Sequence, residues 1–393
     1  DEPGLELYRR SLDQLFRMRE HVLSHAEEAI LARAGEMASA PEEIFSLLND
    51  ADLSFPDAHD AQGNAHPVTH GSYIPLMMSS DRALRMSAFK SVYDTYGQFR
   101  NTFAATLAAQ AKQLKFYTDV RKYGSALEYC LDHTEVPTEV YTNLISTVHK
   151  NLPAMHRYVK MRKEALGVDE LHFYDLYVPL VEDVEMDFTY EQACELILKA
   201  LEPMGQDYLA LVRKGLSERW IDVYETPGKR SGGYSAGGYG MHPVILLNFQ
   251  GKLDDVFTLI HEMGHSIHTY LSCANQPVCY SDYVIFVAEV ASTCNEALLT
   301  RYLLDHAKNE RERAYFLNHF LEQFRATLYR QTMFAEFELK VAELTAQGAG
   351  ITADALCGIY KELNAQYFGD GIALDENIAL EWARIPHFYY RFY

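Results

Sequence analysis

The stretch 257-FTLIHEMGHSIHTY-270 decides how this sequence is interpreted. Its histidines His261 and His265 are four residues apart, so on a helix both side chains leave the same face about one turn apart. Two imidazoles on adjacent turns can bind one metal ion from the same side, and Glu262 lies beside the first of them. The apolar positions that predict a buried helix are Phe257, Leu259, Ile260 and Ile267. We therefore expect a metal site on a buried helix.

A second apolar stretch supplies the third ligand that a catalytic zinc site requires. The sequence 284-VIFVAEVASTCNEALL-299 carries Glu289, far enough after His265 for one turn and an antiparallel return. A carboxylate on an apolar helix needs a partner, and a metal ion would be one. We predict that His261, His265 and Glu289 bind one Zn²⁺ per chain and leave a fourth position open. Glu262 would then take a proton from an attacking water.

Other residues of these two stretches allow both a functional and a purely structural interpretation. Glu296 could hydrogen-bond a ligand imidazole or could face solvent. His268 is interpreted as a core or supporting residue and not as a ligand. Gly264 costs about 1 kcal/mol relative to Ala inside a helix, so we expect another backbone to pass close to it. The alternative for the whole set is packed, hydrogen-bonded histidines, with Glu289 paired to a Lys or Arg.

The composition is that of an ordinary globular chain with a strong acidic excess. The 393 residues are 48% hydrophobic and 23% charged, with 35 basic against 55 acidic residues and a formal charge of −20. A field of this sign repels phosphate backbones and anionic lipid, so we expect neither nucleic acid nor membrane as a partner. No apolar stretch reaches the ~20 residues of a bilayer span, and the first residues lack the positive-then-apolar pattern, so we expect no signal peptide. The six cysteines form no CxxC pair and indicate reduced thiols in a cytoplasmic protein.

Helical periodicity dominates on both sides of the metal-site stretch. Ser24 and Glu27 have the spacing of a capping box, which predicts the start of a helix at the next residue after Ser24. The segment 138–166 is predicted as one helix with a kink or break at Pro153. The sequence therefore predicts a mainly α fold.

Strand-like segments are few. We expect short strands at 73–76, 171–181 and 243–249, the last of them just before the helix of the HExxH motif. The fold class is thus mainly α, with a small β element beside the metal-site helix. We divide the chain into an N-terminal helical region, 1–78, and a catalytic domain, 79–393.

A glycine-rich segment, 231–240, comes directly before the last of these strands. An edge strand offers free N–H and C=O groups to an extended peptide, and glycines let a flanking loop flex over it. We interpret the strand at 244–248 as such an edge; the alternative is an ordinary hairpin loop. The glycines do not form a phosphate-binding loop, because Lys229 and Arg230 precede them and the order strand–GxxxxGKS–helix is absent from the sequence.

Several segments together resemble a known family. HEMGHSIH followed by FVAEVASTCNE is similar to the thimet-oligopeptidase-like zinc metallopeptidases, and within them to the oligoendopeptidase F branch. GKRSGGYS before HPVILLNFQGKLDDVF, the closing 382-WARIPHFYYRFY-393 and the opening EEIFSLLNDADLSF also resemble this branch. The resemblance covers most of the chain. It implies a gluzincin-like helical shell around a deep channel, zinc ligands at His261, His265 and Glu289, and Glu262 as the catalytic base.

The resemblance also implies a substrate class and further site residues. Substrates would be short, unfolded peptides that a zinc endopeptidase cuts internally. His387 and a tyrosine after it would donate hydrogen bonds to the developing oxyanion. Tyr393 has the most suitable spacing, followed by Tyr390 and Tyr389. The family continues beyond the last tyrosine here, so we expect the C-terminal end of the catalytic domain to be truncated. The sequence indicates no oligomeric state.

Two other functions stay open at this point. A zinc carboxypeptidase or dipeptidyl carboxypeptidase shares the HEMGH core, but its downstream motif would carry Asp four residues after the third ligand, where this chain has Thr293. A non-catalytic peptide-binding protein with a structural zinc would usually have four protein ligands. No Cys or His in the sequence stands at a suitable spacing for that fourth ligand.

Overall fold

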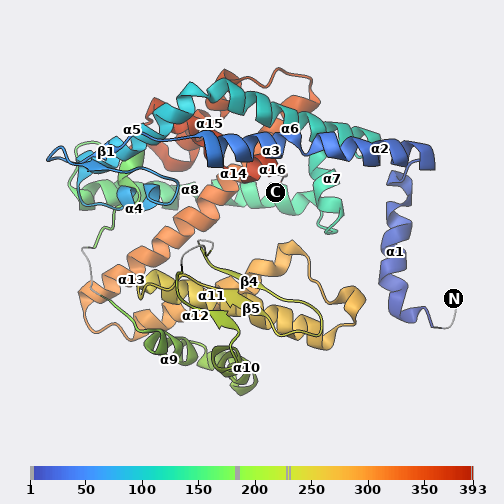
Figure 1. The fold of residues 1–393 in the computed structure, drawn as a ribbon. Helices are drawn as coiled ribbons and strands as arrows, with labels where there is room; N and C mark the ends of the chain where they lie inside the picture. Colours follow the sequence, from blue (N-terminus) through green and yellow to red (C-terminus); the bar gives the residue numbers. More distant parts are fainter. Residues whose placement is uncertain (1–3, 182–185, 227–228, 230–231, 391, 393) are drawn as a thin grey trace. The chain divides into compact units, whose positions relative to one another are not determined.

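The computed structural model describes residues 4–181, 186–226, 229, 232–390 and 392. The contacts within the chain define two compact units. The first unit consists of Asp1–Gln14 and Val181–Leu321, and the second of Leu15–Leu180 and Glu322–Tyr393. Both are mainly helical (Figure 1), which confirms the predicted fold class. The expected functional boundary after residue 78 and the expected channel stay predictions.

The first unit contains the metal-site helix, a small sheet and the helices around them. Its helices are α9 (Tyr190–Ala200), α10 (Gln206–Ser217), α11 (Leu253–Asn275), α12 (Ala288–Asp305) and α13 (Glu310–Gln323), with 3-10 turns at Glu6–Tyr8, Glu202–Met204, Val278–Tyr280 and Ile285–Val287. Its strands are β3 (Ile221–Asp222), β4 (Tyr234–Ala236) and β5 (Val244–Leu246). The chain passes to the second unit within α1 (Arg9–Arg17).

The second unit is built from long helices and one two-stranded ribbon, β1 (Ala58–His59) with β2 (Ala65–His66). Its helices are α2 (His25–Ala38), α3 (Ala40–Leu47), α4 (Tyr73–Met77), α5 (Arg82–Gln98), α6 (Arg100–Val120), α7 (Ala126–Asp132), α8 (Thr138–Leu166), α14 (Arg330–Ala346), α15 (Ala353–Phe368) and α16 (His387–Tyr390). Short 3-10 segments lie at Met18–His21, Phe173–Asp175, Gly369–Gly371 and Glu376–Arg384, and π-helical turns at Leu48–Asp52 and Phe324–Tyr329.

Helix boundaries follow the caps that the sequence carries. The capping box of Ser24 and Glu27 forms as predicted and starts α2. Helix α8 has the predicted bounds, and Pro153 lies inside it without ending it. At the start of α11, the Asp255 carboxylate accepts the N–H groups of Gln250 and Lys252, at 3.0 and 2.8 Å. An acidic residue there also interacts favourably with the positive end of the helix dipole.

Each unit has its own apolar core. In the first unit the core forms around one face of α11, where the side chains of Val256, Leu259, Ile260 and Met263 are fully buried. Leu259 and Ile260 are two of the four positions predicted to be buried, and the other two, Phe257 and Ile267, are buried as well. The helix that carries the two histidines is therefore fixed by its own hydrophobic periodicity.

Helices α11 and α12 pack closely at Gly264, and the contacts His261–Glu296 and Gly264–Ser292 show that they run antiparallel. A Cβ at Gly264 would lie 2.8 Å from the Cα of Ser292 and 2.9 Å from the carbonyl oxygen of Ala291. Real side chains do not approach a backbone so closely, so glycine is required at this crossing. The expected close passage of another backbone is confirmed, and it brings the third candidate ligand next to the two histidines.

The sheet of the first unit differs from the prediction in one respect. Its strand order is β3-β5-β4, with β5 parallel to β3 and antiparallel to β4. The strand expected at 244–248 forms as β5 but lies in the centre, so its interpretation as the edge is wrong. The edge strands are β3 and β4, and β4 comes from the described part of the glycine-rich segment.

Two segments predicted as strands are not strands. Residues 73–76 lie in α4, because Thr69 and Ser72 hydrogen-bond each other and the Thr69 carbonyl accepts the N–H of Tyr73. Pro75 fits there because the first turn of a helix does not need its missing N–H. Within 171–181, the Asp175 carboxylate accepts the N–H of His172 and stabilises a 3-10 turn.

Candidate metal centre and catalytic site

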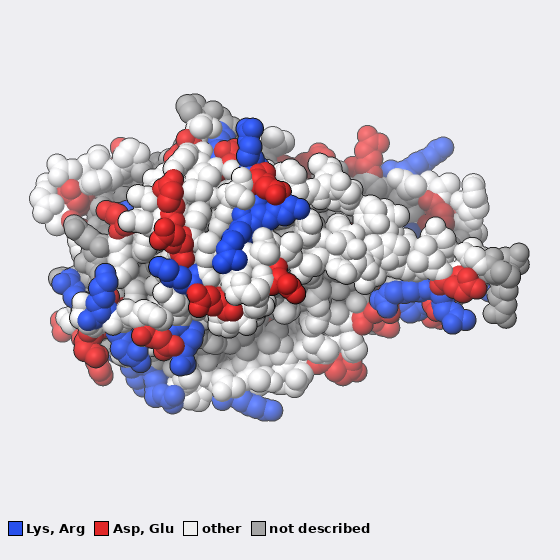
Figure 2. Space-filling model, turned by 90° about the horizontal axis from the view of Figure 1, so that it is seen from below, with Lys and Arg blue, Asp and Glu red and all other residues white. Residues whose placement is uncertain are grey.

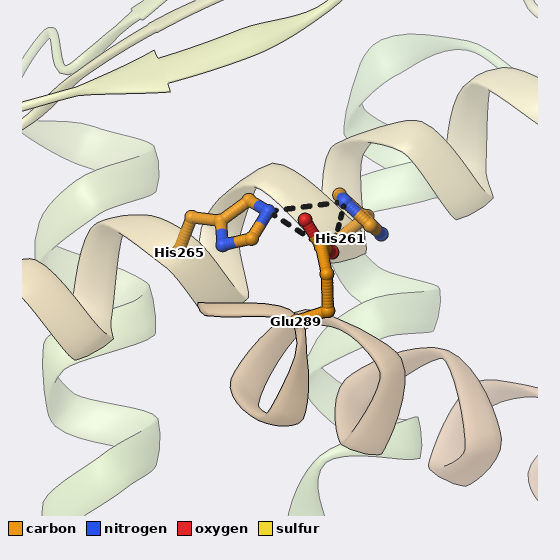
Figure 3. Close-up of side chains that lie close together, drawn as sticks. All are labelled: His261, His265 and Glu289. Carbon is orange, nitrogen blue, oxygen red and sulfur yellow. Dashed lines mark hydrogen bonds and ion pairs between the residues drawn. The ribbon is translucent and has the colours of Figure 1, made fainter. Parts of the chain in front are cut away.

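Three side chains converge between α11 and α12, as Figure 3 shows. The Nε2 atoms of His261 and His265 lie 3.1 Å apart. The Oε2 atom of Glu289 lies 3.3 Å from the first and 3.4 Å from the second. Within the described part of the chain, these residues form a cluster of three candidate metal ligands. The structure therefore brings together the three residues that the sequence predicts as zinc ligands.

The spacing of these three atoms fits a tetrahedral metal ion. A zinc ion with nitrogen and oxygen ligands at about 2.0–2.1 Å holds neighbouring ligand atoms about 3.3 Å apart. The measured separations lie between 3.1 and 3.4 Å. Three protein ligands on one side leave the fourth tetrahedral position for water or substrate, which is typical of catalytic zinc.

Other groups orient each of the three side chains. The Nδ1 atom of His261 lies 2.9 Å from Oε1 of Glu296, and His265 is hydrogen-bonded to the backbone of Ala288. Such bonds fix the tautomer and direct the remaining nitrogen toward a metal. The functional interpretation of Glu296 is thus favoured over a solvent-facing one.

The Ser292 hydroxyl donates to Oε2 of Glu289 at 2.7 Å. The sequence interpretation did not include this serine. Its signal was present, because a residue three positions after a ligand on the same helix lies next to it. Ser292 therefore belongs to the set of groups that hold the candidate ligands in place.

Glu262 is held between α11 and the edge strand β4. Its side chain is buried, and the backbone N–H of Ser235 hydrogen-bonds its carboxylate. The hydroxyl groups of Ser235 and Ser266 lie 2.7 Å apart, which joins β4 to α11 a second time. The sequence interpretation missed both serines, because the contact between a strand and a helix is tertiary and no spacing in the sequence indicates it.

The titratable groups of the cluster shift in different directions. Burial by itself lowers the pKa of His261, but the hydrogen bond to Glu296 and the nearby carboxylates outweigh it and raise this pKa above its ordinary value. Burial lowers the pKa of His265. Burial raises the pKa of Glu262, while His261 opposes this shift. A carboxylate with a raised pKa is a stronger base, as proton transfer near neutral pH requires.

His268 is separate from the cluster. Its ring stacks on Tyr283 with the centroids 3.7 Å apart and an interplanar angle of 10°. Burial lowers its pKa, which favours the neutral ring. The interpretation of His268 as a packed residue, and not as a ligand, is therefore supported.

Three exposed apolar side chains flank Glu289 along the chain. Ile285, Phe286 and Val290 are 66%, 58% and 65% exposed. They come from the 3-10 turn before α12 and from its first turn. The Glu289 side chain is itself 62% exposed, so the third candidate ligand is accessible to solvent.

The predicted oxyanion donors belong to the second unit. His387 and Tyr390 are the first and last residues of α16 and are exposed, whereas Phe388 and Tyr389 are buried. The Tyr389 hydroxyl donates to the carbonyl oxygen of Ala383 at 3.2 Å. This favours a packing role for Tyr389 and leaves His387 and Tyr390 on the accessible face. Tyr393 lies outside the described residues.

Charge and hydropathy add little about partners. Figure 2 shows basic and acidic side chains intermixed on the face that it draws. Among the described helices, none is both long enough and apolar enough to cross a bilayer. The expectation of no nucleic acid and no membrane partner stays a prediction.

A helix with the HExxH motif, paired antiparallel with a helix that carries a glutamate, is an architecture suited to metallopeptidases. The model of peptidase family M3 matches residues 75–393, and the model described as oligopeptidase F matches residues 1–55. The chain therefore belongs to peptidase family M3, which confirms the resemblance found in the sequence.

Individual relatives agree with this assignment. Oligopeptidase PepF of Bacillus subtilis (strain 168) is 49% identical over 393 residues, which are 100% of this chain and 59% of that protein. A solved structure from Chlamydophila abortus is 38% identical with a TM-score of 0.90, and oligoendopeptidase-F from Enterococcus faecium is 40% identical with a TM-score of 0.80. This chain is covered completely in both, and it covers 66% and 64% of those chains. The chain thus spans about three fifths of the length of such relatives.

Proposed function

We propose that this chain carries the zinc site and the catalytic base of an endopeptidase that hydrolyses peptide bonds within short, unfolded oligopeptides. The observation that carries the proposal is the triangle of His261 Nε2, His265 Nε2 and Glu289 Oε2, with sides of 3.1, 3.3 and 3.4 Å. Membership of a peptidase family supports the same reaction class. The names of the relatives, oligopeptidase and oligoendopeptidase, support the substrate class.

His261, His265 and Glu289 would hold the ion. When bound, zinc supplies a Lewis acid that lowers the pKa of water and polarises a peptide carbonyl. Glu296, Ser292 and the backbone of Ala288 keep the three ligands oriented. A preorganised set of this kind binds metal more tightly than the same residues on a mobile loop.

Glu262 would act as the general base and then as the acid. Its carboxylate takes a proton from the attacking water and later gives it to the amine nitrogen of the leaving peptide. Its burial and the N–H of Ser235 hold it in one position on α11. The pKa raised by burial helps the carboxyl group to hold that proton between the two steps.

An extended peptide would bind along β4. This strand pairs with β5 on one side and is one of the two edges of the sheet, the one that contacts Glu262. Main-chain hydrogen bonds to an edge strand require an extended substrate, which selects unfolded peptides. The exposed side chains of Ile285, Phe286 and Val290 would contact apolar residues near the scissile bond.

The developing oxyanion would receive hydrogen bonds from His387 and from a tyrosine, Tyr390 or Tyr393. Exposure of His387 and Tyr390 on one face of α16 supports this role. We also propose that the protein works in the cytoplasm, because the structure forms no disulfide among its six cysteines, all of which it describes.

A fluorogenic peptide with blocked ends, quenched internally, tests this function against its alternatives. We expect internal cleavage that a chelator abolishes and added zinc restores. A carboxypeptidase or dipeptidyl carboxypeptidase needs a free C-terminus and would leave this peptide intact. A binding protein with structural zinc would cleave neither a blocked nor a free peptide. Mass spectrometry of the products locates the cut, and absence of zinc-dependent internal cleavage would contradict the proposal.

A further inference from the structure

One face of α11 carries a stripe of polar side chains, formed by Thr258, Glu262, Ser266 and Thr269. Their spacings of four, four and three residues place them above one another on a helix. The two histidines of the candidate metal centre each precede a member of this stripe, so they lie on the neighbouring face. Glu262 is buried, and Ser266 is completely buried. Because buried polar groups are costly without partners, the stripe requires a polar element packed against it.

That element is the edge strand β4, together with a glycine on either side of it. A Cβ at Gly233 would lie 2.7 Å from Cγ2 of Thr258. At the other end of the strand, a Cβ at Gly237 would lie 2.8 Å from Cγ2 of Thr269. Real Cβ atoms do not approach other heavy atoms within 3.0 Å. The strand therefore packs this closely on α11 only because both positions are glycine.

Ser235, midway between these glycines, is attached to α11 at two points. Its backbone N–H donates to the carboxylate of Glu262, and its hydroxyl oxygen lies 2.7 Å from that of Ser266. Glu262 and Ser266 are one helical turn apart, so the two bonds span about 5–6 Å of the helix. The completely buried hydroxyl of Ser266 thus has a hydrogen-bond partner on β4.

The pattern Gly-x-Ser-x-Gly admits one register of β4 on this stripe. The smallest shift of a strand that keeps the same side chains toward its neighbour is two residues. Such a shift would place a glycine opposite Ser266, so the bond between the two hydroxyl groups would be lost. It would also bring the Ser235 side chain against a threonine methyl group, where a Cβ does not fit. The serine pair and the two glycines therefore fix the register together.

We propose that Ser266 is a positioning residue, which holds β4 in register through the Ser235 hydroxyl and so keeps the Ser235 N–H on the Glu262 carboxylate. This inference rests on the proposed function, in which Glu262 is the general base. A base acts only within hydrogen-bond reach of the proton that it takes, and a misplacement of about 1 Å can cost about 10²-fold in rate. Since Ser266 is completely buried, it acts on the reaction through β4 and Glu262.

Hydrogen exchange of the Ser235 amide tests the positional part of the inference without any assay of activity. Ser266→Ala should accelerate this exchange by at least about tenfold, because the N–H is no longer held on Glu262. The matched control is Ser217→Ala, which removes an exposed hydroxyl of the same unit that donates to the Arg213 carbonyl at 2.8 Å. It should leave the exchange rate of Ser235 unchanged. An unchanged rate in Ser266→Ala overturns the proposal, whether or not the protein cleaves peptides.

Steady-state kinetics with the internally quenched peptide test the consequence for the base. Ser266→Ala and Ser235→Ala should each lower kcat about tenfold, with KM and the Kd for zinc within about twofold of the unmodified protein. The double variant should be no slower than either single variant, because both remove the same bond. A loss of Tm with kcat intact, or additive losses of kcat, overturns the proposal. If the unmodified protein shows no zinc-dependent cleavage, the proposed function fails, and the exchange of the Ser235 amide alone decides the role of Ser266.

A compensating pair of substitutions tests the register itself. Gly233→Ala should lift β4 off α11 and lower kcat by a similar factor, because the new Cβ meets the methyl group of Thr258. Thr258→Ser removes that methyl group and keeps the hydroxyl, which donates to the Asp254 carbonyl at 2.9 Å. The combined variant should therefore recover most of the lost kcat and the slow exchange of the Ser235 amide. No loss in Gly233→Ala, or a loss that Thr258→Ser does not reverse, contradicts the close packing that the proposal requires.

Discussion

Two clusters of charged side chains, one in each unit, are unbalanced in opposite directions. In the first unit, two imidazole nitrogens and a carboxylate oxygen converge within 3.4 Å of one another. In the second unit, guanidinium groups around Glu322 and Glu381 outnumber the carboxylates. Electron-pair donors that converge suit a cation, whereas the guanidinium groups of the second unit already pair with Glu322 and Glu381. The first cluster is therefore suited to bind an ion, and the second to hold the fold together through buried ion pairs.

The two clusters also differ in how they arise from the sequence. The metal ligands His261 and His265 are four residues apart on one regular helix, so their spacing already fixes their geometry. The second cluster instead joins Arg330, which directly follows a π-helical turn, to Glu381 in a distant 3-10 segment. The difference teaches that local spacing on a regular helix predicts a site, whereas a cluster made by tertiary contacts has no signal in the sequence.

The largest effect is expected at the base of the first cluster. Glu262→Gln removes a proton acceptor but keeps the size of the side chain, so kcat should fall by about 10²–10⁴ while zinc content is retained. Steady-state kinetics and metal analysis of the same preparation check this. The control Glu195→Gln on α9 changes an exposed glutamate of the same unit and should be neutral. A Glu262→Gln enzyme within a few-fold of the unmodified protein would assign the base to another group.

In the second cluster, the equivalent Glu-to-Gln substitution should lower the free energy of unfolding and leave the zinc content unchanged. Glu381→Gln leaves the largely buried Arg330 without its carboxylate, which should cost about 3 kcal/mol in the free energy of unfolding. Chemical denaturation measures this cost. Glu376→Gln, on the same 3-10 segment but exposed, is the control and should change little. If Glu381→Gln loses no more stability than Glu376→Gln, the ion pair between Glu381 and Arg330 does not stabilise the second unit.

The pH dependence of stability follows from the same glutamate. Burial by itself raises the pKa of Glu381, but Arg330 and Arg384 outweigh burial and hold this pKa below its ordinary value. A carboxyl group with a lowered folded-state pKa stabilises the protein above its unfolded-state pKa, and this contribution is lost as pH falls through the folded-state pKa. The free energy of unfolding, measured by chemical denaturation at a series of acidic pH values, should therefore fall less steeply with decreasing pH in Glu381→Gln than in the unmodified protein.

A smaller effect on turnover is expected from α16 of the second unit. His387→Ala and Tyr390→Phe should each lower kcat and kcat/KM together by about 10²–10³ and leave KM nearly unchanged, as loss of an oxyanion donor does. Tyr389→Phe is the matched control, because its hydroxyl bonds the Ala383 carbonyl. It should cost about 1 kcal/mol of stability and no turnover. If Tyr390→Phe behaves like Tyr389→Phe, Tyr390 is a packing residue.

The smallest effect concerns the support of a ligand. Glu296→Gln weakens the hydrogen bond to Nδ1 of His261, so zinc affinity should fall by about 10–100-fold. Competition with a chromophoric chelator measures the Kd. Turnover at saturating zinc should recover most of its value, which a role for Glu296 in the chemical step would not allow. An unchanged Kd would show that α12 positions His261 by packing alone.

The sequence predicts the parts of this molecule that depend on local periodicity. The buried face of α11, the bounds of α8, the cap at Ser24 and the close crossing at Gly264 all follow from residue spacing and hydrophobic pattern. The first three depend on residues within a few turns of one another, and Gly264 is signalled locally because a glycine inside a helix is costly. The third ligand, Glu289, could be assigned in the same way, because it is an acidic residue within a locally apolar helical stretch.

Features that depend on tertiary contacts could not be predicted in this way. The central position of β5 depends on its pairing with β3, which is distant in sequence. Residues 73–76 have strand-like composition, but the bonds between Thr69 and Ser72 start a helix there. Ser235 reaches Glu262 only because β4 folds against α11. In each case a partner outside the segment determines the outcome.

The metal content of the purified protein tests the central claim most directly. We predict one zinc per chain, with X-ray absorption that shows two imidazole nitrogens and a carboxylate oxygen at about 2.0–2.2 Å. His265→Ala should fold, keep its helical circular dichroism and lose the zinc, whereas a substitution at the stacked His268 should keep it. A correctly folded protein that takes up no zinc, or that binds it equally after His265→Ala, would contradict the account.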